Sequence, residues 1–309
     1  MTAGGTLHLE HLVMSHPVIR GSLVALVTPF HPDGSVNFEK LGELIDFHLA
    51  NKTDALVILG TTGESSTMTH EEDNAVCEFT VKRVAGRIPV ICGSGSNDTQ
   101  TMLEKSLSFE RLGADGLLII TPYYNKSNEE GIYQHFVTVA DAVNIPCILY
   151  NVPGRTGCSI SEANVARLAK HPNIIGIKEA SGNISYAAKI ARYLSEDFVM
   201  YSGNDDMIVP LLSLGASGVI SVLANVAPLQ THNMVMDFLE GRIEDARRAQ
   251  LDLLRVTNDL FIEVNPIPVK EAMNLMGMEV GGYRLPLYPM TEAHREVLRA
   301  SLKDAGFIK

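Results

Sequence analysis

The chain has 309 residues, a formal net charge of −11 and 46% hydrophobic residues. This composition is that of an ordinary globular protein, and it excludes disordered, collagen-like and disulfide-scaffold classes. The 25 lysines and arginines are scattered along the chain, so the charge pattern argues against nucleic acid as a partner. We therefore expect a soluble folded protein.

No apolar run reaches the roughly 20 residues that a bilayer-spanning helix needs, so we expect no membrane partner. The N-terminus lacks the features of a secretory or transit peptide, and we interpret residues 1–20 as an N-terminal extension, with Met14 as an alternative start. The four cysteines are far apart and show no C-x-x-C spacing, which predicts reduced, mostly buried thiols. These observations together predict a cytoplasmic location.

Eight short apolar runs recur along the chain. Each is continuously apolar rather than alternating, as expected for strands of a parallel sheet that is covered on both faces. The runs cover residues 22–28, 55–60, 89–94, 116–121, 146–151, 174–178, 198–203 and 218–222.

Stretches with helical spacing separate these runs, and several end in a glycine suited to a left-handed cap, such as Gly86, Gly113 and Gly215. Eight consecutive strand–helix units predict an α/β protein built as a closed (β/α)₈ barrel rather than an open doubly wound sheet. Beyond the eighth run only helical patterns follow, at residues 227–241, 243–261, 268–277 and 291–306.

The chain thus divides into an N-terminal extension (residues 1–20), a catalytic barrel (residues 21–241) and a C-terminal helical region (residues 242–309). No Pro- or Ser-rich linker separates the last two, so we expect the helical region to pack on the barrel. In barrels of this type the chemistry lies at the carboxyl ends of the strands. We therefore expect the functional residues there and not in the helical region.

Lys178 ends the sixth apolar run, where its amine would face a dry barrel mouth. Desolvation favours a neutral amine, which can attack a ketone to form a Schiff base. The alternative is a structural lysine that leaves the strand for solvent or pairs with Glu179.

Tyr150 ends the fifth run, and Arg155 follows it in the same loop. A phenol can relay protons, and a guanidinium can hold a carboxylate through two parallel hydrogen bonds. Alternatively, the two are an ordinary strand tyrosine and a surface arginine. The pair gains meaning only in combination with Lys178.

Two further loops carry polar or aromatic side chains. The GTTGES loop, residues 60–65, follows the second run and could hold an anion or transfer a proton, although it is also an ordinary tight turn. Tyr123 and Tyr124 follow the fourth run directly. They could serve as a proton relay or as an interface anchor, or they could simply pack on the next helix.

Other site types are disfavoured. The ten histidines include no H-x-x-x-H or H-E-x-x-H spacing, so we expect no metal. No G-x-S-x-G elbow, Walker loop or G-x-G-x-x-G occurs at a strand end, so neither a serine hydrolase nor a nucleotide cofactor is indicated. Covalent imine chemistry without a cofactor remains.

Six motifs occur in one order along the chain: GTTGES, TPYYNK, LYNVPGRTG, GIKEASGN, YSGND and NPIPVK. With these motifs, from about Gly21 to the C-terminus, the chain resembles the 4-hydroxy-tetrahydrodipicolinate synthase family, also called dihydrodipicolinate synthases. The family belongs to the pyruvate-dependent class I aldolase superfamily. The resemblance implies a lyase that condenses pyruvate with L-aspartate 4-semialdehyde through a lysine Schiff base, the first committed step of diaminopimelate and lysine biosynthesis.

The resemblance also implies roles for particular residues. Lys178 would form the Schiff base and Tyr150 would be the central proton relay. Thr61 would lie between that tyrosine and Tyr124, which family members lend to a neighbouring subunit across a tight dimer interface.

The substrate-binding positions follow in the same way. Thr62 would bind the pyruvate carboxylate, and Arg155 would bind the carboxylate of the semialdehyde. Gly203 and Ile220 would line the pyruvate pocket.

Many relatives are inhibited by lysine at a cleft between two subunits. The residues that match this allosteric cleft are Ser65, Ser66, His70, Asn97 and Tyr123. However, Asp73 stands where lysine-sensitive relatives often have histidine, and Thr101 stands where they have glutamate. Without that carboxylate an effector's ammonium loses a charge-assisted hydrogen bond, so we predict weak or absent inhibition by lysine.

The resemblance implies a homotetramer, a dimer of tight dimers, in which Tyr124 acts only beside a neighbour. One alternative is another pyruvate-dependent aldolase, such as N-acetylneuraminate lyase or a 2-keto-3-deoxy sugar acid aldolase, which shares the lysine and the tyrosine. A second is a non-catalytic barrel that senses an amino acid or keto acid, which would require loss of Lys178 or its relay. The paired threonines, TPYY and NVPGRTG favour the synthase.

Overall fold

A computed structural model describes residues 16–309. In this range the eight apolar runs form eight parallel strands, ordered β1 to β8 around the sheet, and β8 pairs with β1 to close it. The strands are β1 (Gly21–Ala25), β2 (Ala55–Ile58), β3 (Val90–Gly93), β4 (Gly116–Ile120), β5 (Cys147–Asn151), β6 (Ile174–Glu179), β7 (Val199–Ser202) and β8 (Gly218–Ser221). The prediction of a closed (β/α)₈ barrel is confirmed.

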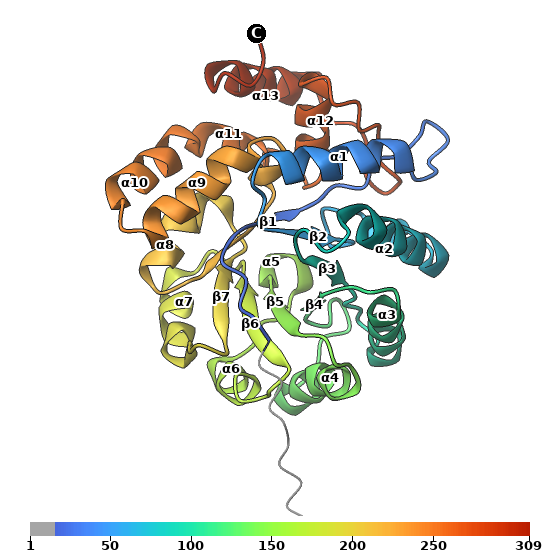
Figure 1. Cartoon of the computed structure of the whole chain (residues 1–309), viewed down its shortest axis with the longest axis vertical. Coiled ribbons are helices and arrows are strands. Elements are labelled where there is room, and N and C mark those ends of the chain that lie inside the picture. The colour runs from blue at the N-terminus through green and yellow to red at the C-terminus, as the bar shows by residue number, and fades with distance from the viewer. Residues whose placement is uncertain (1–15) are drawn as a thin grey trace, which may run out of the picture.

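Helices surround the barrel and continue beyond its last strand (Figure 1). Those between strands are α1 (Phe38–Ala50), α2 (His70–Val84), α3 (Thr99–Arg111), α4 (Glu129–Ala142), α5 (Pro153–Thr156), α6 (Glu162–Leu168), α7 (Ile184–Ile190) and α8 (Ile208–Ser213). Those after β8 are α9 (Pro228–Leu239), α10 (Ile243–Asp252), α11 (Leu254–Asp259), α12 (Ile267–Leu275) and α13 (Glu292–Asp304).

Local signals account for most helix boundaries. Thr69 and Glu72 form a reciprocal capping box at the start of α2. Gly86, Gly113 and Gly215 have φ values of +72°, +92° and +96°, so the expected left-handed positions after helices are confirmed. The pattern over residues 243–261 differs from expectation, because it forms two helices that meet at Leu253 rather than one.

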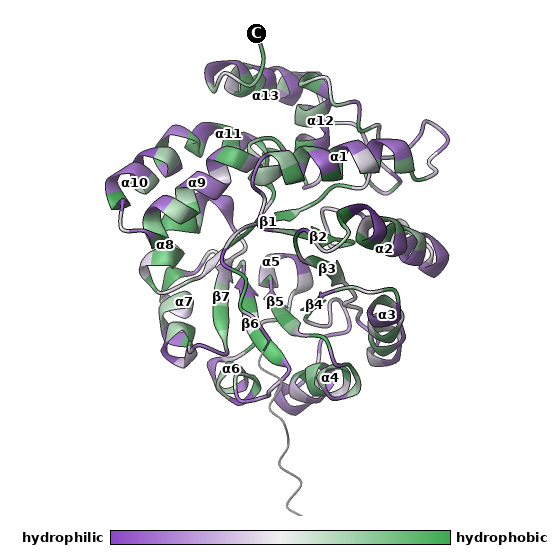
Figure 2. Cartoon of the chain, viewed as in Figure 1, coloured by the Kyte–Doolittle hydropathy of each residue, from purple (hydrophilic) through white to green (hydrophobic). Residues whose placement is uncertain are grey.

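The strands pack apolar side chains on both faces. Inward-facing residues such as Ala55, Val57 and Ile148 form a core inside the barrel. Outward-facing residues such as Leu56 and Leu149 join the larger core between strands and helices. Figure 2 accordingly shows the strands as mainly hydrophobic, whereas the outer helices carry both kinds of residue. This two-sided burial explains why the runs are continuously apolar.

The segment before β1 and the helical region lie against the barrel. The Tyr201 hydroxyl donates to the Ile19 carbonyl at 2.7 Å, and Val18 and Ile19 pack on the inner core. Residues 16–20 are therefore docked, while the rest of the predicted N-terminal extension lies outside the described residues. In Figure 1, α12 and α13 lie at one end of the molecule, next to α1 and α11.

The four cysteines are buried and none forms a disulfide, as their spacing predicted. Cys77 on α2 and Cys92 on β3 are neighbours, with 3.5 Å between their sulfur atoms. Over residues 16–309, no helix combines the length and the apolar character needed to cross a bilayer.

Candidate active site

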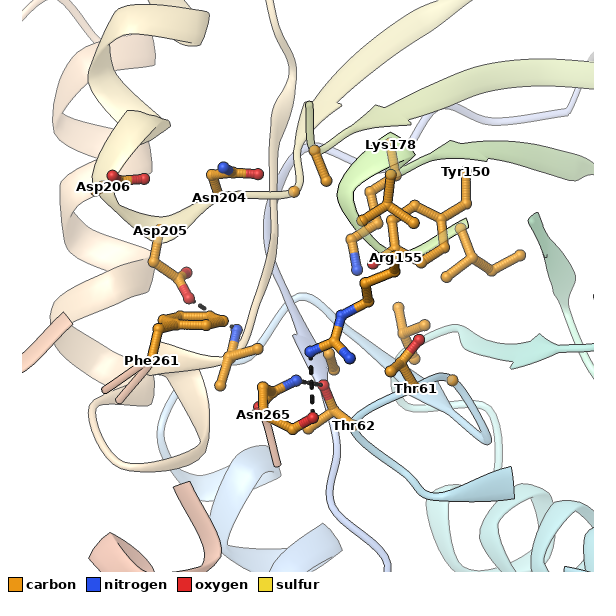
Figure 3. Close-up of a pocket in the computed structure, with 18 of the residues that line it drawn as sticks. Thr61, Thr62, Tyr150, Arg155, Lys178, Asn204, Asp205, Asp206, Phe261 and Asn265 are labelled. Carbon is orange, nitrogen blue, oxygen red and sulfur yellow. Dashed lines mark hydrogen bonds between the residues drawn. The ribbon is translucent and has the colours of Figure 1, made fainter. Parts of the chain in front are cut away.

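A cavity of about 380 Å³ opens at the carboxyl ends of the barrel strands, and most of its labelled side chains point into it (Figure 3). Its wall is made partly by strand ends and the loops that follow them, and partly by the helical region. The residues that carry polar groups into it include Thr61, Thr62, Tyr150, Arg155, Lys178, Asn204, Asp205, Asp206, Thr257, Asn258 and Asn265.

Lys178 lies on the inner face of β6, and only 6% of it is exposed. Its amine is 4.2 Å from the ring centroid of Tyr150, the residue paired with it on β5. Glu179 does not pair with it, because its carboxylate accepts hydrogen bonds from Asn151 Nδ2 at 2.8 Å and from Ser181 N at 2.7 Å. Within residues 16–309 the Lys178 amine makes no ion pair, so it faces the cavity without a fixed partner.

Thr61, Thr62 and Gly203 line the same cavity as this amine. The Thr62 hydroxyl accepts a hydrogen bond from Asn265 Nδ2 at 2.9 Å. A Cβ atom at Gly203 would lie 3.1 Å from Lys178 Cε and 2.6 Å from Ala180 Cβ. A larger residue at this position would therefore collide with Ala180 and press on the lysine side chain.

Arg155 belongs to the short helix α5 and is exposed at the mouth of the cavity. One of its Nη atoms donates to the backbone oxygen of Asn265 at 3.2 Å (Figure 3). No carboxylate in the described part of the chain pairs with it. A guanidinium held in this way can bind a ligand's carboxylate by donating hydrogen bonds to it.

Two predicted residues lie elsewhere in this chain. Ile220 does not line the cavity but packs inside the barrel beside Leu23, its partner on the neighbouring strand β1. It lies one step below Val222, which does line the cavity. Tyr124 is 90% exposed, and its backbone has a φ of +70°. It contributes nothing to its own chain's cavity.

The helical region contributes to the cavity, contrary to the expectation that functional residues lie outside it. Thr257, Asn258, Phe261 and Asn265 line the wall that faces the strand ends. Asn265 is buried, and its Oδ1 atom has no hydrogen-bond partner in residues 16–309. Its motif, NPIPVK, is visible in the sequence, but no local pattern places it opposite Thr62.

Asp205 is a second residue that sequence reasoning left unassigned. It lines the cavity but is almost completely buried, and its carboxylate accepts from the Ser221 hydroxyl and from the backbone of Val222 and Leu223. Burial raises its pKa, and these hydrogen bonds oppose that shift. Asp205 thereby ties the loop after β7 to the end of β8.

A second cavity, of about 460 Å³, shares Thr61, Tyr150 and Arg155 with the first. Four of the five predicted allosteric residues line it, namely Ser65, Ser66, His70 and Tyr123. Asn97 does not, although its carbonyl accepts from the Asn125 side chain at 2.8 Å.

Asp73 and Thr101 also line this second cavity. The Asp73 carboxylate lies 2.8 Å from the Lys105 amine in a buried ion pair. Burial raises the pKa of Asp73, and the charge on Lys105 partly opposes the shift. No group of three His, Cys, Asp or Glu side chains able to hold a metal occurs among residues 16–309.

Comparison with known proteins identifies the family. The dihydrodipicolinate synthetase family matches residues 18–305. The chain belongs to this family. It is 56% identical to the 4-hydroxy-tetrahydrodipicolinate synthase of Caldicellulosiruptor saccharolyticus over 290 residues. The alignment covers 94% of this chain and 98% of that relative. It is therefore an enzyme, a lyase of the 4-hydroxy-tetrahydrodipicolinate synthase class.

Two solved structures have the same fold. The chloride-inhibited dihydrodipicolinate synthase of Acinetobacter baumannii, complexed with pyruvate, is 43% identical, with a TM-score of 0.92 over 94% of this chain and 100% of that one. DHDPS of Cyanidioschyzon merolae, with lysine bound, is 39% identical, with a TM-score of 0.91 over 94% of this chain and 99% of that one.

Proposed function

We propose that this chain condenses pyruvate with L-aspartate 4-semialdehyde through a Schiff base on Lys178, to give 4-hydroxy-tetrahydrodipicolinate. Family membership supports the reaction. The assignment of the Schiff base to Lys178 is supported by the surroundings of its amine. This amine is buried at the mouth of a closed barrel, lacks an ion-pair partner in the described chain and lies 4.2 Å from the ring centroid of Tyr150.

The reaction starts at the Lys178 amine, which attacks the ketone carbon of pyruvate and releases water to leave an imine. Loss of a methyl proton gives an enamine, which forms the carbon–carbon bond to the aldehyde. The substrate's own amine then displaces Lys178 by transimination and closes the ring. Tyr150 moves the protons in these steps, and Thr61 orients its hydroxyl.

Two carboxylates have to be held while this bond forms. Thr62 binds that of pyruvate, in the pocket bounded by Gly203, and Arg155 binds that of the semialdehyde at the cavity mouth. The Acinetobacter relative is complexed with pyruvate, which supports pyruvate as one of the two substrates. Holding both reactants in one orientation lowers the entropic part of the barrier.

Intact mass after incubation with pyruvate and borohydride tests this proposal, because reduction traps an imine permanently. We expect one reduced pyruvate adduct on the wild-type chain and none on Lys178→Ala. The matched control is Lys189→Ala, an exposed lysine on α7, which should keep the adduct. An unmodified wild-type protein that is folded would contradict the proposal and favour a non-catalytic sensor.

We further propose that the chain acts in the cytoplasm as a homotetramer of tight dimers, with residues 21–241 as the catalytic barrel and residues 242–309 as its helical region. The exposed Tyr124, held at a positive φ, supports a role in a neighbour's site. Sedimentation should give a tetramer, and Tyr124→Phe should lower kcat without changing assembly. A fully active monomer would contradict this proposal.

A further inference from the structure

The loop that carries Thr61 and Thr62 follows β2 and has an unusual backbone. Leu59 and Glu64 bracket it, with φ values of +59° and +57°. Residues other than glycine rarely adopt this left-handed conformation, which is strained and persists only where the surrounding structure holds it. Contacts outside the loop must therefore fix its shape.

The strongest of these contacts comes from the helical region. Lys270 on α12 donates from Nζ to Glu64 Oε1 at 2.6 Å and to the Gly282 carbonyl at 2.7 Å. Both side chains of the pair are buried, Lys270 completely. The other Glu64 oxygen accepts from the backbone of Arg284 at 3.2 Å. Glu64 is thus held by two segments of the helical region.

Two more contacts act on the same loop. The Thr28 hydroxyl, after β1, donates to the Gly63 carbonyl at 2.6 Å. Asn265 donates to Thr62 at 2.9 Å from the turn that precedes α12. The helical region therefore reaches the loop at Thr62 and at Glu64, on both sides of Gly63.

Stability alone is a weak reason for a fully buried ion pair. Removing two charges from water carries a large desolvation penalty, and well-packed apolar residues often stabilise such a site as well or better. Burial lowers the pKa of Lys270 to about 8, against the opposing effect of Glu64, which reflects the same cost. What the pair supplies is a fixed position of the loop relative to α12.

We propose that Lys270 and Glu64 are positioning residues that set the Gly60–Ser65 loop for pyruvate. Neither lines the cavity, so both act through Thr61 and Thr62. The inference rests on the proposed function, in which Thr62 binds the pyruvate carboxylate. It gives the helical region a defined role in catalysis.

Three variants separate positioning from stability. Lys270→Met and Glu64→Gln each leave one buried charge unpaired, so both should lose stability and pyruvate binding. The double variant, K270M/E64Q, has no buried charge at this place, and its thermal midpoint should return close to that of the wild type. Its KM for pyruvate should stay raised by roughly tenfold to a hundredfold, because small displacements of binding groups are costly.

Arg295→Met is the matched control. It removes the ion pair between Arg295 on α13 and Glu271 on α12, whose nitrogen and oxygen atoms are 2.5 Å apart. This pair belongs to the same helical region but makes no contact with the Gly60–Ser65 loop. We expect its KM for pyruvate to equal that of the wild type. A double variant that regains both stability and pyruvate binding would reduce the Lys270–Glu64 pair to a structural role and overturn the inference.

Hydrogen exchange distinguishes failure of this inference from failure of the proposed function. In the double variant, backbone amides of residues 60–65 should exchange about tenfold faster, while those of β5 and β6 stay unchanged. If wild type forms no adduct with pyruvate, the proposed function fails, and exchange still decides whether the pair holds the loop. Equal exchange in wild type and double variant overturns the inference.

Discussion

The two walls of the active-site cavity are built differently. On the barrel side, Tyr150 and Lys178 are partners in the β5–β6 ladder, so backbone hydrogen bonds fix their relative position. On the helical side, Asn265 and Lys270 reach the loop around Gly63 through side-chain hydrogen bonds from residues far along the chain. The groups that we propose to react stand on the strands of the sheet, and the groups that support them come from the helical region.

This difference implies different results of substitution. A side chain on the strand wall can be changed without disturbing the ladder, so its loss should affect the chemistry far more than the stability. A side chain on the helical wall holds another segment in place, so its loss should affect both. The following measurements sharpen this comparison or contradict it.

The largest effect is expected at Tyr150. Tyr150→Phe removes the hydroxyl and should lower kcat about 10²- to 10⁴-fold, the usual contribution of a positioned acid–base group. Its thermal midpoint should stay near that of the wild type, since the hydroxyl faces the cavity. Steady-state kinetics and thermal unfolding of the same samples measure both quantities.

Tyr201→Phe is its control. Tyr201 is also an inner-face tyrosine of the barrel, but its hydroxyl donates to Ile19 before β1. Its loss should lower the free energy of unfolding by about 1 kcal/mol and leave kcat within a few-fold. Equal loss of activity in both variants would show that Tyr150 acts through packing and not through proton transfer.

A smaller effect on activity is expected at Asn265. Asn265→Leu removes the hydrogen bond to Thr62 and should raise the KM for pyruvate about tenfold, because the threonine loses its fixed orientation. Unlike Tyr150→Phe, it should also lower the free energy of unfolding. Phe261→Leu, on the same wall without that hydrogen bond, should bind pyruvate as the wild type does. A similar rise in KM for both would assign the effect to the shape of the wall.

The same contrast decides what the sequence could predict. The strands were predictable because each is a short run buried on both faces. The placement of Lys178 and Tyr150 in the cavity was predictable because each lies near the carboxyl end of such a run. Their meeting follows from the ladder, which puts adjacent strand ends side by side. Local sequence patterns are therefore sufficient to predict the strand wall of the site.

The helical wall was not predictable in this way. The contacts from Asn265 to Thr62 and from Lys270 to Glu64 join residues 203 and 206 positions apart, and no periodicity encodes such a pairing. The placement of Ile220 below the cavity depends likewise on how β8 is staggered against β1. The break at Leu253 also lacks a glycine or proline signal.

Acid should act on the barrel through His48 on α1. Complete burial lowers its pKa from 6.5 to about 3, so the folded state keeps it neutral while the unfolded chain takes up a proton below pH 6.5. Stability therefore falls as the pH falls through 6.5. Between pH 7 and 5.5 the loss from this residue is about 1 kcal/mol.

Denaturant unfolding at the two pH values checks this, with His48→Gln compared with the wild type. The variant keeps a side chain able to bond Thr53, the present partner of His48 Nδ1 at 2.8 Å, but it does not titrate. It should lose less stability on acidification than the wild type does. Equal slopes for His48→Gln and wild type would contradict the prediction.

The smallest effect, an absence of inhibition, is expected when lysine is added. The second cavity has one carboxylate in its described lining, Asp73, and the Lys105 amine already lies 2.8 Å from it. Thr101 cannot replace a carboxylate, and its hydroxyl donates to Asp98 at 2.6 Å. The ammonium of a lysine effector would therefore find no free anion there, and lose the charge-assisted hydrogen bond that would hold it.

Initial rates with increasing lysine should stay flat for the wild type, although the relative from Cyanidioschyzon merolae has lysine bound. Thr101→Glu adds a carboxylate to the cavity wall and should create measurable inhibition. Gln100→Glu adds the same charge at the exposed neighbouring position and should not. Inhibition of the wild type at low lysine concentration would mean that an effector can displace Lys105 from Asp73. The Asp73–Lys105 ion pair of the barrel could then be opened by a ligand, in contrast to the Lys270–Glu64 pair, which joins the helical region to the Gly60–Ser65 loop.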